Sequence, residues 1–399
     1  MDVRVPTMPY DVAFLSASAW GSHDVSHVCD ATRRGVFADA SLRARSAFLI
    51  GGDWMHASQV EKNEETTLQK EVLLEVEDLR IYFELGRQKV AKAVDGVSFT
   101  IHKGETVALV GESGSGKSIT SLSIMRLVPM PPGKLVSGSV KLNDREILTL
   151  PEKKMREVRG NEIGMIFQEP MTSLDPVFTI GNQIMESLLH HQGLKRKEAK
   201  NKAIDLLKLV GIANAEKVVD EYPHQLSGGM RQRVMIAIAM SNNPKLLIAD
   251  EPTTALDVTV QAQILKLMLK MKEEFNSSIL LITHDMGVVA ETADRVLVMY
   301  GGQIVEEAAV KELFLNPKHP YTKALLKTMP SLDQNVDRLP SIPGSVPPAH
   351  SFPQGCRFAE RCEFAFDQCK QQLPELINVT DAHKARCHLY SGFGGGSIV

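Results

Sequence analysis

Short apolar runs alternate with segments of helical periodicity from residue 71 onward. Runs rich in Val, Ile and Leu predict strands, and they lie at 72–77, 97–101, 106–110, 139–142, 163–167, 245–251, 278–283, 295–300 and 303–307. Apolar residues that recur three or four positions apart predict helices, and these lie at 118–128, 180–191, 195–210, 231–240 and 258–275. The alternation of strands and helices predicts an α/β fold.

The first 70 residues lack this organisation. They show no sustained period of either kind and end in a polar, linker-like stretch at 58–67. Their apolar patches, at 12–15 and 47–50, are too short for the core of a secretory signal. We therefore expect residues 1–70 to be largely disordered, and Met55 is a candidate start of translation.

The composition is that of an ordinary soluble globular chain, with 43% hydrophobic and 23% charged residues. The net charge of −3 argues against a protein that binds nucleic acid through bulk positive charge. No run approaches the eighteen consecutive apolar residues that a bilayer-spanning helix needs. Any association with a membrane would therefore depend on a partner.

A glycine-rich turn follows the predicted strand at 106–110. Its sequence, GESGSGKS at 111–118, fits the phosphate-binding pattern G-x-x-x-x-G-K-[ST] at every fixed position. The glycines let successive backbone N–H groups point inward, and the following helix N-terminus adds partial positive charge, so the turn would hold a polyphosphate. Lys117 would reach the β- and γ-phosphates, and Ser118 would ligate Mg²⁺. The candidate nucleotide-binding residues are Gly111, Ser113, Gly114, Ser115, Gly116, Lys117, Ser118 and Ile119.

Two other interpretations of this turn are weaker. A pattern with four fixed positions also occurs by chance, but the strand before the turn and the helix after it provide the context that the motif requires. A dinucleotide-binding fingerprint would need glycine at the position that Ile119 occupies. The stretch therefore favours a nucleotide-binding site.

Two adjacent acids end the predicted strand at 245–251. Carboxylates at the end of a buried strand are costly unless a cation or a reaction uses them. Asp250 suits a role in holding Mg²⁺, and Glu251 could polarise an attacking water. His284 ends the next predicted strand, where a histidine is more often structural, but this strand end shares its sheet edge with the glycine-rich turn. Gln168 directly follows another predicted strand.

Two further stretches carry candidates with open alternatives. Ser227, Gly228 and Gly229 open a second helix. A serine at such a place is normally a simple N-cap, but the free helix N-terminus could also meet an anion. Phe83, or its neighbour Tyr82, could stack on an adenine, and packing on an edge strand explains an aromatic residue there equally well.

Four of the five cysteines follow residue 355, at Cys356, Cys362, Cys369 and Cys387. This clustering suggests a reducing compartment and a local ligand set rather than distributed disulfides. The spacing is neither a CxxC pair nor a ferredoxin run, so four buried, reduced thiols are the alternative.

Six motifs, in order along the chain, resemble those of the nucleotide-binding subunit of ABC transporters. They correspond to that family's Walker A, Q-loop, signature, Walker B, D-loop and H-switch motifs, and lie at 111–118, Gln168, 226–230, 246–251, Asp257 and His284. The resemblance covers roughly residues 72–310. It implies an ABC-type P-loop NTPase domain over 71–310, with a mixed sheet core, an antiparallel β subdomain and a helical subdomain at about 170–242. Met230 stands where the family's signature usually ends in glutamine.

The resemblance also implies how the nucleotide is held and cleaved. In this family two subunits pair head to tail and enclose each ATP, with its Mg²⁺, between them. The enclosing residues would be Lys117 and Ser118 of one subunit and Ser227, Gly228 and Gly229 of the other. The remaining implied roles are Glu251 as catalytic base, His284 as sensor of the γ-phosphate, Gln168 as a contact to Mg²⁺ and the attacking water, and Asp257 as the D-loop residue.

The tail of the chain, with a proline-rich turn at 342–348 and the four cysteines, resembles the C-terminal extension of the oligopeptide and dipeptide importer ATPases. The resemblance implies a small C-terminal domain at 311–399. In some relatives such a tail is thought to hold an iron–sulfur cluster, which implies a 4Fe–4S cluster or zinc on the four thiolates. His383 and His388 could substitute as zinc ligands.

Together the motifs and the tail imply an ATPase that energises the import of short peptides at the cytoplasmic face of the cell membrane. One phosphate loop and one signature make half of a pair, so a homologous second ATPase subunit or a second copy of this chain is required. The resemblance further implies two membrane permease subunits and, indirectly, a separate solute-binding protein. Nickel or another small solute is the alternative cargo, because the ATPase does not touch the cargo.

Two other function classes fit less well. Soluble ABC-type ATPases that act on DNA or ribosomes carry long coiled-coil insertions or two cassettes. This sequence has neither, so no nucleic-acid partner is expected. A P-loop kinase or GTPase would have no use for the signature at 226–230.

Overall fold

The computed structural model describes residues 71–86, 89–168, 173–254, 256–329 and 341–391. The expected disorder of the first 70 residues and the candidate start at Met55 lie outside these ranges. Across the described ranges, no helix combines the length and the apolar character that crossing a membrane requires.

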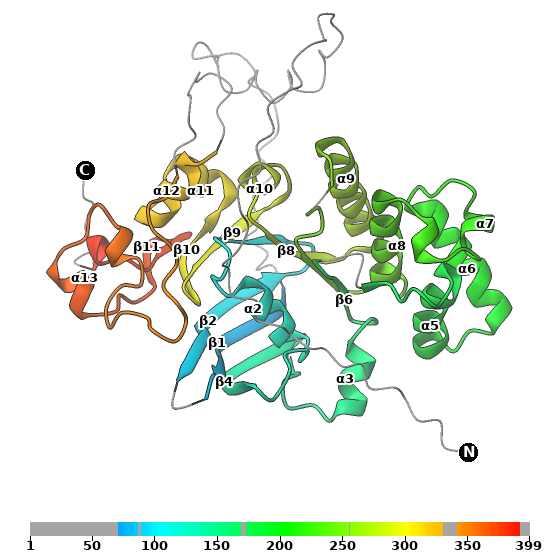
Figure 1. Ribbon diagram of the computed structural model, residues 1–399, viewed down its shortest axis with the longest axis horizontal. Helices are drawn as coiled ribbons and strands as arrows, with labels where there is room; N and C mark the ends of the chain where they lie inside the picture. Colours follow the sequence, from blue (N-terminus) through cyan, green and yellow to red (C-terminus); the bar gives the residue numbers. More distant parts are fainter. Residues whose placement is uncertain (1–70, 87–88, 169–172, 255, 330–340, 392–399) are drawn as a thin grey trace, which may run out of the picture. The chain divides into compact units, whose positions relative to one another are not determined.

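An eight-stranded sheet forms the centre of the described chain (Figure 1). Its order is β11 (Ile377–Thr380), β12 (His383–Ala385), β10 (Gln303–Ala309), β9 (Arg295–Tyr300), β3 (Thr106–Val110), β8 (Ser278–Thr283), β7 (Leu246–Asp250) and β6 (Ile163–Ile166). The five strands from β9 to β6 are parallel, and β10, β12 and β11 continue the sheet in antiparallel pairs. Every residue of β3, β7 and β8 is buried, as expected for parallel strands that are covered on both faces.

A second, four-stranded antiparallel sheet is built by β2 (Val90–His102), β1 (Val72–Glu84), β4 (Gly133–Leu142) and β5 (Arg145–Glu146). β1 continues well past the predicted end at residue 77. Its pairing register shifts between Val76 and Leu79, where Asp78 takes a left-handed φ of 44°. This irregularity interrupts the apolar–polar alternation, and it explains why the pattern predicted only the first half of the strand.

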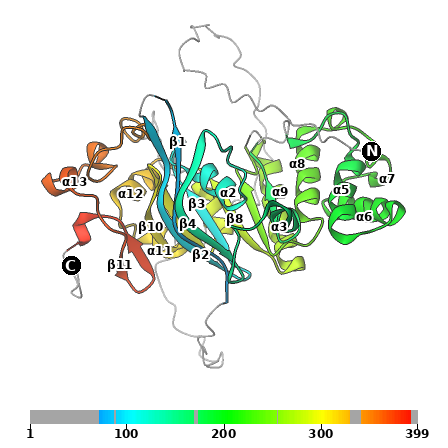
Figure 2. The same ribbon diagram turned by 90° about the horizontal axis from the view of Figure 1, so that it is seen from below.

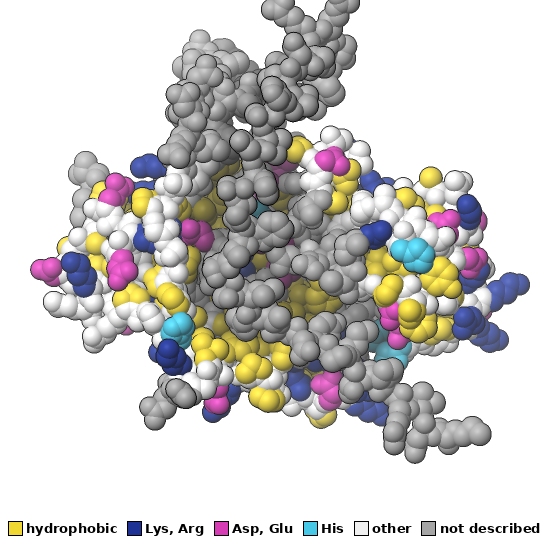
Figure 3. Space-filling model, in the orientation of Figure 1, with side chains coloured by type: hydrophobic (Ala, Val, Ile, Leu, Met, Phe, Trp, Pro, Cys, Tyr) yellow, Lys and Arg dark blue, Asp and Glu magenta, His cyan; other side chains and the backbone are white. Residues whose placement is uncertain are grey.

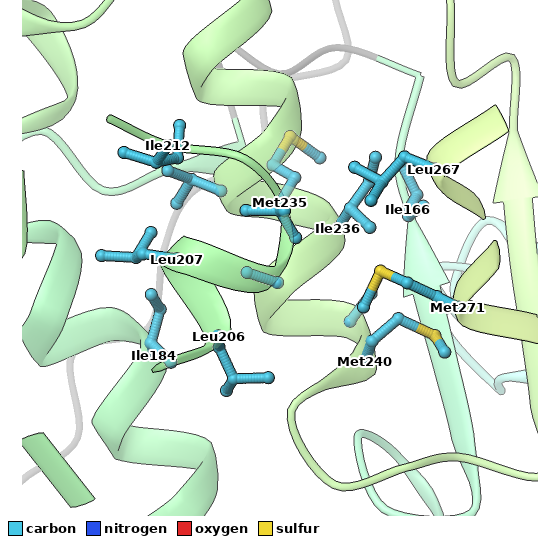
Figure 4. Packing of buried hydrophobic residues seen from close by; sticks show 14 of the residues in the cluster. Ile166, Ile184, Leu206, Leu207, Ile212, Met235, Ile236, Met240, Leu267 and Met271 are labelled. Carbon is cyan, nitrogen blue, oxygen red and sulfur yellow. The ribbon is translucent and has the colours of Figure 1, made fainter. Parts of the chain in front are cut away.

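The described helices are α2 (Lys117–Ile124), α3 (Glu152–Val158), α5 (Ile180–Gln192), α6 (Arg196–Leu209), α7 (Ala215–Val218), α8 (Gly228–Met240), α9 (Val258–Phe275), α10 (Met286–Thr292), α11 (Val310–Leu315), α12 (Pro320–Lys327) and α13 (Asp367–Gln371). Figures 1 and 2 show α5 to α8 grouped beyond the β6 edge of the large sheet, and β11 and α13 at the opposite edge. Buried side chains of α8, such as Ile236 and Met240, connect the other helices of this group to β6 and α9. They pack near Ile166 of β6 and Met271 of α9 (Figure 4).

One predicted helix is shorter than its apolar pattern. The pattern predicts 118–128, whereas α2 ends at Ile124. Arg126 adopts a left-handed φ of 52°, and the N–H group of Leu127 donates to the carbonyl of Leu122 at 2.8 Å. This is a Schellman ending, which usually carries glycine at the left-handed position. Arginine gives no such signal in the sequence.

The C-terminal residues 341–391 continue the large sheet. β12 pairs with β10, and Phe358 packs against Tyr300 and Tyr321 with ring centroids 5.2 and 5.4 Å away. All three rings are buried. The chain after β10 therefore shares its core with strands β3 and β9 of the large sheet.

A fully buried carboxylate, Glu306 on β10, ties the C-terminal residues together. It accepts the backbone N–H groups of Lys318 at 2.6 Å and His319 at 2.9 Å, and His383 Nε2 lies 2.7 Å from it. His319 in turn caps α12, because its Nδ1 accepts the N–H group of Tyr321 at 3.0 Å. Burial lowers the pKa of His319 to about 4, so this imidazole is neutral in the folded protein.

His319 should make the protein less stable in mild acid. Its folded pKa of about 4 lies below the ordinary value of about 6.5, so between these pH values the unfolded chain binds more protons. Lowering the pH from 8 to 5 should therefore cost about 2 kcal/mol through this group. His319→Asn keeps a side-chain acceptor for the helix cap but cannot titrate. We expect the variant to lose less stability over this range in urea unfolding followed by circular dichroism; equal losses in both proteins would contradict the prediction.

Candidate functional site

The glycine-rich turn 111–118 links the end of β3 to the start of α2, as predicted. Gly111 and Gly116 have φ values of 152° and 107°, which favour glycine. A Cβ atom at Gly111 would lie 2.1 Å from the carbonyl oxygen of Met299, and one at Gly116 would lie 2.4 Å from that of Ala93. Neighbouring backbone therefore fixes the turn on one side, and only glycine fits at these two positions.

Lys117 is buried in this turn. Its Nζ donates to the carbonyl oxygens of Gly111 at 2.8 Å and Glu112 at 3.1 Å. Burial lowers the pKa of Lys117, while the carboxylates of Glu251 and Asp250 raise it. The ammonium group therefore lies among acceptors that compensate its charge only in part.

Asp250 ends β7 beside the turn, as the sequence predicted. Ser118 Oγ donates to Asp250 Oδ1 at 3.1 Å, and Asp250 is only 4% exposed. Burial raises the pKa of Asp250 to about 6. A carboxylate and a hydroxyl are the hard oxygen ligands that Mg²⁺ prefers, and a bound cation would favour the ionised carboxylate. The chemistry of this pair therefore fits Mg²⁺.

Three side chains from separate segments converge on Glu251. Gln168 Nε2 and Thr254 Oγ1 each donate to Glu251 Oε2 at 3.0 Å, and His284 Nδ1 lies 3.5 Å from Oε1. Glu251 has a left-handed φ of 47°, an uncommon backbone conformation for a non-glycine residue and one that is frequent at functional sites. The structure thus brings together Gln168, Glu251 and His284, which the sequence proposed separately.

The signature residues lie at an exposed helix start. Ser227 caps α8, because its Oγ accepts the N–H group of Met230 at 3.3 Å. A Cβ atom at Gly228 would meet no heavy atom within 4 Å, so the backbone there faces open space. Asp257 caps the neighbouring helix α9 by accepting the N–H group of Val260 at 3.0 Å. Among the described residues, the hydrogen bonds of 227–229 stay local and do not reach the glycine-rich turn.

The two aromatic candidates have structural partners. Phe83 is half-buried against the cluster that includes the small sheet, and its ring lies 3.3 Å from a Cβ atom built at Gly133. Tyr82 Oη donates to Asp95 Oδ1 at 2.6 Å. These contacts account for both side chains, and adenine stacking by Phe83 stays a prediction.

The four cysteines line one small cavity together with His319 and His388. All four are free thiols, and Cys369 and Cys387 are buried. Burial raises the pKa of Cys356 and of Cys387 to about 11, so both are protonated at neutral pH unless a metal binds them. In the described part of the chain, no group of three or more His, Cys, Asp or Glu side chains is placed to hold a single metal ion.

Several residues at the site were not found from the sequence. Thr254 donates to Glu251, and Arg361 and Tyr321 contact Glu112 in the glycine-rich turn. Thr254 lies three positions after Glu251, and a search of the turn that follows the strand could have found it. Arg361 and Tyr321 come from the distant C-terminal part, so no local pattern indicates them.

Two family models match the chain. The model described as "ABC transporter" matches residues 94–254. The model described as "Oligopeptide/dipeptide transporter, C-terminal region" matches residues 305–369. The first spans the stretch from the glycine-rich turn to Glu251, and the second covers three of the four clustered cysteines.

Curated relatives match over most of their length. The chain is 58% identical over 322 residues to the oligopeptide transport ATP-binding protein AppD of Bacillus subtilis (strain 168), which is 81% of this chain and 98% of that protein. It is 49% identical over 317 residues to the dipeptide transport ATP-binding protein DppD of Haemophilus influenzae, which is 79% of this chain and 95% of that protein.

Solved structures show the same fold. A dimeric structure of the ATP-binding cassette MJ0796, in a post-hydrolysis state bound to ADP and phosphate, matches with a TM-score of 0.54 and 28% identity, over 60% of this chain and 99% of that one. CbiO1 from Clostridium perfringens, part of an ABC transporter complex, matches with a TM-score of 0.52 and 29% identity, over 62% of this chain and 92% of that one. The fold is therefore that of an ABC-type P-loop NTPase, and the chain is an ATPase that uses ATP and Mg²⁺. This chain belongs to the family of oligopeptide and dipeptide ABC transporter ATP-binding subunits.

Proposed function

We propose that this chain hydrolyses ATP to drive the import of short peptides through a membrane complex. The observation that carries the proposal is the convergence of Gln168, Thr254 and His284 on the Glu251 carboxylate. Gln168 and His284 follow the ends of two strands, and Thr254 lies in a turn. Together these side chains orient a single candidate base beside the glycine-rich turn. The peptide cargo rests on relatives whose names describe oligopeptide and dipeptide transport.

The glycine-rich turn binds the nucleotide phosphates in this proposal. Lys117 leaves its two carbonyl partners to meet the β- and γ-phosphates, and Ser118 and Asp250 hold Mg²⁺. The phosphates compensate the positive charge of the buried Lys117 ammonium, and Mg²⁺ compensates the negative charge of the buried Asp250 carboxylate. The remaining proposed contacts to the nucleotide are Gly111, Ser113, Gly114, Ser115, Gly116, Ile119 and, at the adenine, Phe83.

Glu251 acts as general base toward the attacking water. Gln168 is within hydrogen-bond reach of its carboxylate and would contact both that water and Mg²⁺. His284, exposed at the end of β8, is free to turn toward a γ-phosphate. Cleavage of the phosphate removes the group that His284 contacts, which gives the site two distinguishable states.

A second cassette would complete each nucleotide site. Ser227, Gly228 and Gly229 form an exposed helix start whose N–H groups suit a γ-phosphate of another subunit, with Asp257 beside them. The second cassette is either a copy of this chain or a homologous subunit. The pair would dock on two permease subunits at the cytoplasmic face of the membrane, and a separate solute-binding protein would deliver the cargo.

Two alternatives receive less support. Nickel or another small solute would use the same ATPase geometry, because the described site contacts only the nucleotide. A soluble ATPase that acts on nucleic acid would be expected to present a continuous basic surface. On the visible face in Figure 3, Lys and Arg side chains are interspersed with Asp and Glu, which does not favour that class.

The cysteine cavity is proposed to hold a 4Fe–4S cluster. Its four thiols surround one space, and thiolate sulfur is the ligand that iron–sulfur clusters require. Zinc on the same thiolates is the alternative metal, because thiolate sulfur is also a zinc ligand. Packing of reduced thiols without any metal remains the alternative.

Glu251→Gln should nearly abolish ATP hydrolysis while it preserves ATP binding. The amide keeps the shape and the contacts to Gln168 but cannot take a proton, so kcat should fall about 10²–10⁴-fold. The variant should also accumulate as an ATP-bound pair of cassettes, measured by light scattering with the second subunit present if one is required. Glu157→Gln, an exposed acid paired with Lys154, is the matched control and should keep parental turnover. Turnover at the parental rate in the Glu251 variant would remove this residue from its role.

The cargo assignment can be tested on the intact complex. Isolation from native membranes should recover two permease subunits, and ATPase activity of the reconstituted complex should rise when short peptides and the solute-binding protein are added. ATPase stimulation by Ni²⁺ but not by peptides would show that the cargo is nickel rather than short peptides. Recovery of ribosomes or nucleic acid without permeases would overturn the transport function.

The cluster proposal has a spectroscopic test. Protein purified without oxygen should be brown, with broad visible absorbance and bound iron by elemental analysis. Cys369→Ser and Cys387→Ser should each lose the colour and the iron. Protein that contains neither iron nor zinc would show that the thiols only pack.

A further inference from the structure

We propose that Arg361 and Tyr321 are positioning residues for ATP binding. Both belong to the C-terminal part of the chain, which we define as the described residues after β10. They hold Glu112, the residue directly after the first glycine of the phosphate-binding turn. The inference rests on the proposed role of this turn in binding ATP. It adds that the C-terminal part sets the affinity of that site.

Arg361 makes a two-pronged ion pair with Glu112. Nη1 donates to Oε2 at 2.8 Å, and Nη2 donates to Oε1 at 2.9 Å. The Arg361 side chain is 6% exposed and that of Glu112 is 29% exposed, so the pair is largely shielded from water. A bidentate, shielded guanidinium–carboxylate pair is stronger and more directional than a surface ion pair.

Tyr321 holds the backbone of the same residue. Its hydroxyl oxygen accepts the N–H group of Glu112 at 2.8 Å, and the tyrosine is fully buried. Tyr321 lies in the first turn of α12, next to the cap provided by His319. The side chain and the backbone N–H group of Glu112 are thus both fixed by residues more than 200 positions away in the sequence.

The backbone carbonyl of Glu112 contacts Lys117, the residue proposed to bind the phosphates. Its carbonyl oxygen accepts a hydrogen bond from Lys117 Nζ at 3.1 Å, beside the 2.8 Å bond to the carbonyl of Gly111. The contacts therefore run from Arg361 and Tyr321, through Glu112, to Lys117 before ATP binds. Lys117 then exchanges its carbonyl partners for the phosphates, while Arg361 and Tyr321 keep holding the turn through Glu112. A turn that is held in shape before ATP arrives loses less conformational freedom on binding, so the effect should appear as affinity.

Attachment of the C-terminal part does not depend on this pair alone. Arg357 binds Asp95 and the carbonyl of Gly301, and Arg386 Nε donates to the carbonyl of Ile304 on β10 at 2.9 Å. Loss of the Glu112 contact should therefore loosen the turn while the C-terminal part stays in place. A change in ATP affinity without detachment of the C-terminal part would therefore indicate a positioning role rather than a purely structural one.

A double-mutant cycle tests the proposal on the full chain. Arg361→Gln and Glu112→Gln should each weaken binding of a non-hydrolysable ATP analogue about tenfold, in line with a shielded charged pair. The double variant should be no weaker than either single variant, because all three lack the same pair. KM for ATP should rise by a similar factor, and kcat should change less than about twofold, since neither residue touches the reacting atoms. Tyr321→Phe should also weaken binding, because it leaves the N–H group of Glu112 without its acceptor.

Matched variants separate the possible outcomes. Lys384→Gln breaks a 3.2 Å ion pair between the same C-terminal part and Glu307 on β10, and it should leave ATP affinity unchanged. If Arg361→Gln fails to fold, the ATP affinity of Glu112→Gln tests the proposal instead. This substitution removes the same ion pair by changing the residue in the turn. Parental affinity in both single variants, or additive losses in the double variant, would overturn the positioning role. If Lys117→Ala bound ATP like the parent, the proposed ATP site itself would fail, whatever the Arg361 result.

Discussion

The nucleotide site depends on two buried charges that the protein compensates only in part. Lys117 begins α2 after the turn that follows β3, Asp250 ends β7, and burial shifts the pKa of each toward its neutral form. Such groups are costly in a folded protein unless a ligand brings the opposite charge. A triphosphate with its Mg²⁺ supplies a negative and a positive partner at once. The fixed glycine turn and the neighbouring ends of β3, β7 and β8 can be understood as the scaffold that holds these two charges at one edge of the sheet.

Much of this scaffold could be predicted from the sequence, because its signals are local. The helix at 258–275 and the strands at 278–283 and 295–300 have the predicted bounds, since each combines a clear period with capping or turn residues at its ends. The fixed positions of the phosphate-binding turn also lie next to one another in the chain. Local spacing was therefore sufficient to find them.

The features that the sequence did not reveal depend on distant contacts or on unusual backbone conformations. β1 was predicted too short because an irregular register at Asp78 breaks its alternation, and α2 was predicted too long because an arginine occupies a position where glycine is the usual signal. Arg361 stands 249 positions from its partner Glu112, so only the folded chain shows the pair. The same holds for Thr254, which gains meaning only once Glu251 is seen to collect donors from several strand ends.

The continuation of the large sheet into β12 and β11 has a consequence for how cassettes of this kind can be shortened or exchanged. A truncated protein that stopped after β10 would keep every motif that identifies an ABC ATPase. It would nevertheless expose the ring of Tyr300 and the edge of β10, and it would leave Glu112 without its basic partner. Chimeric transporters that exchange the nucleotide-binding core should therefore take the residues up to β10 and the residues after it from the same parent protein.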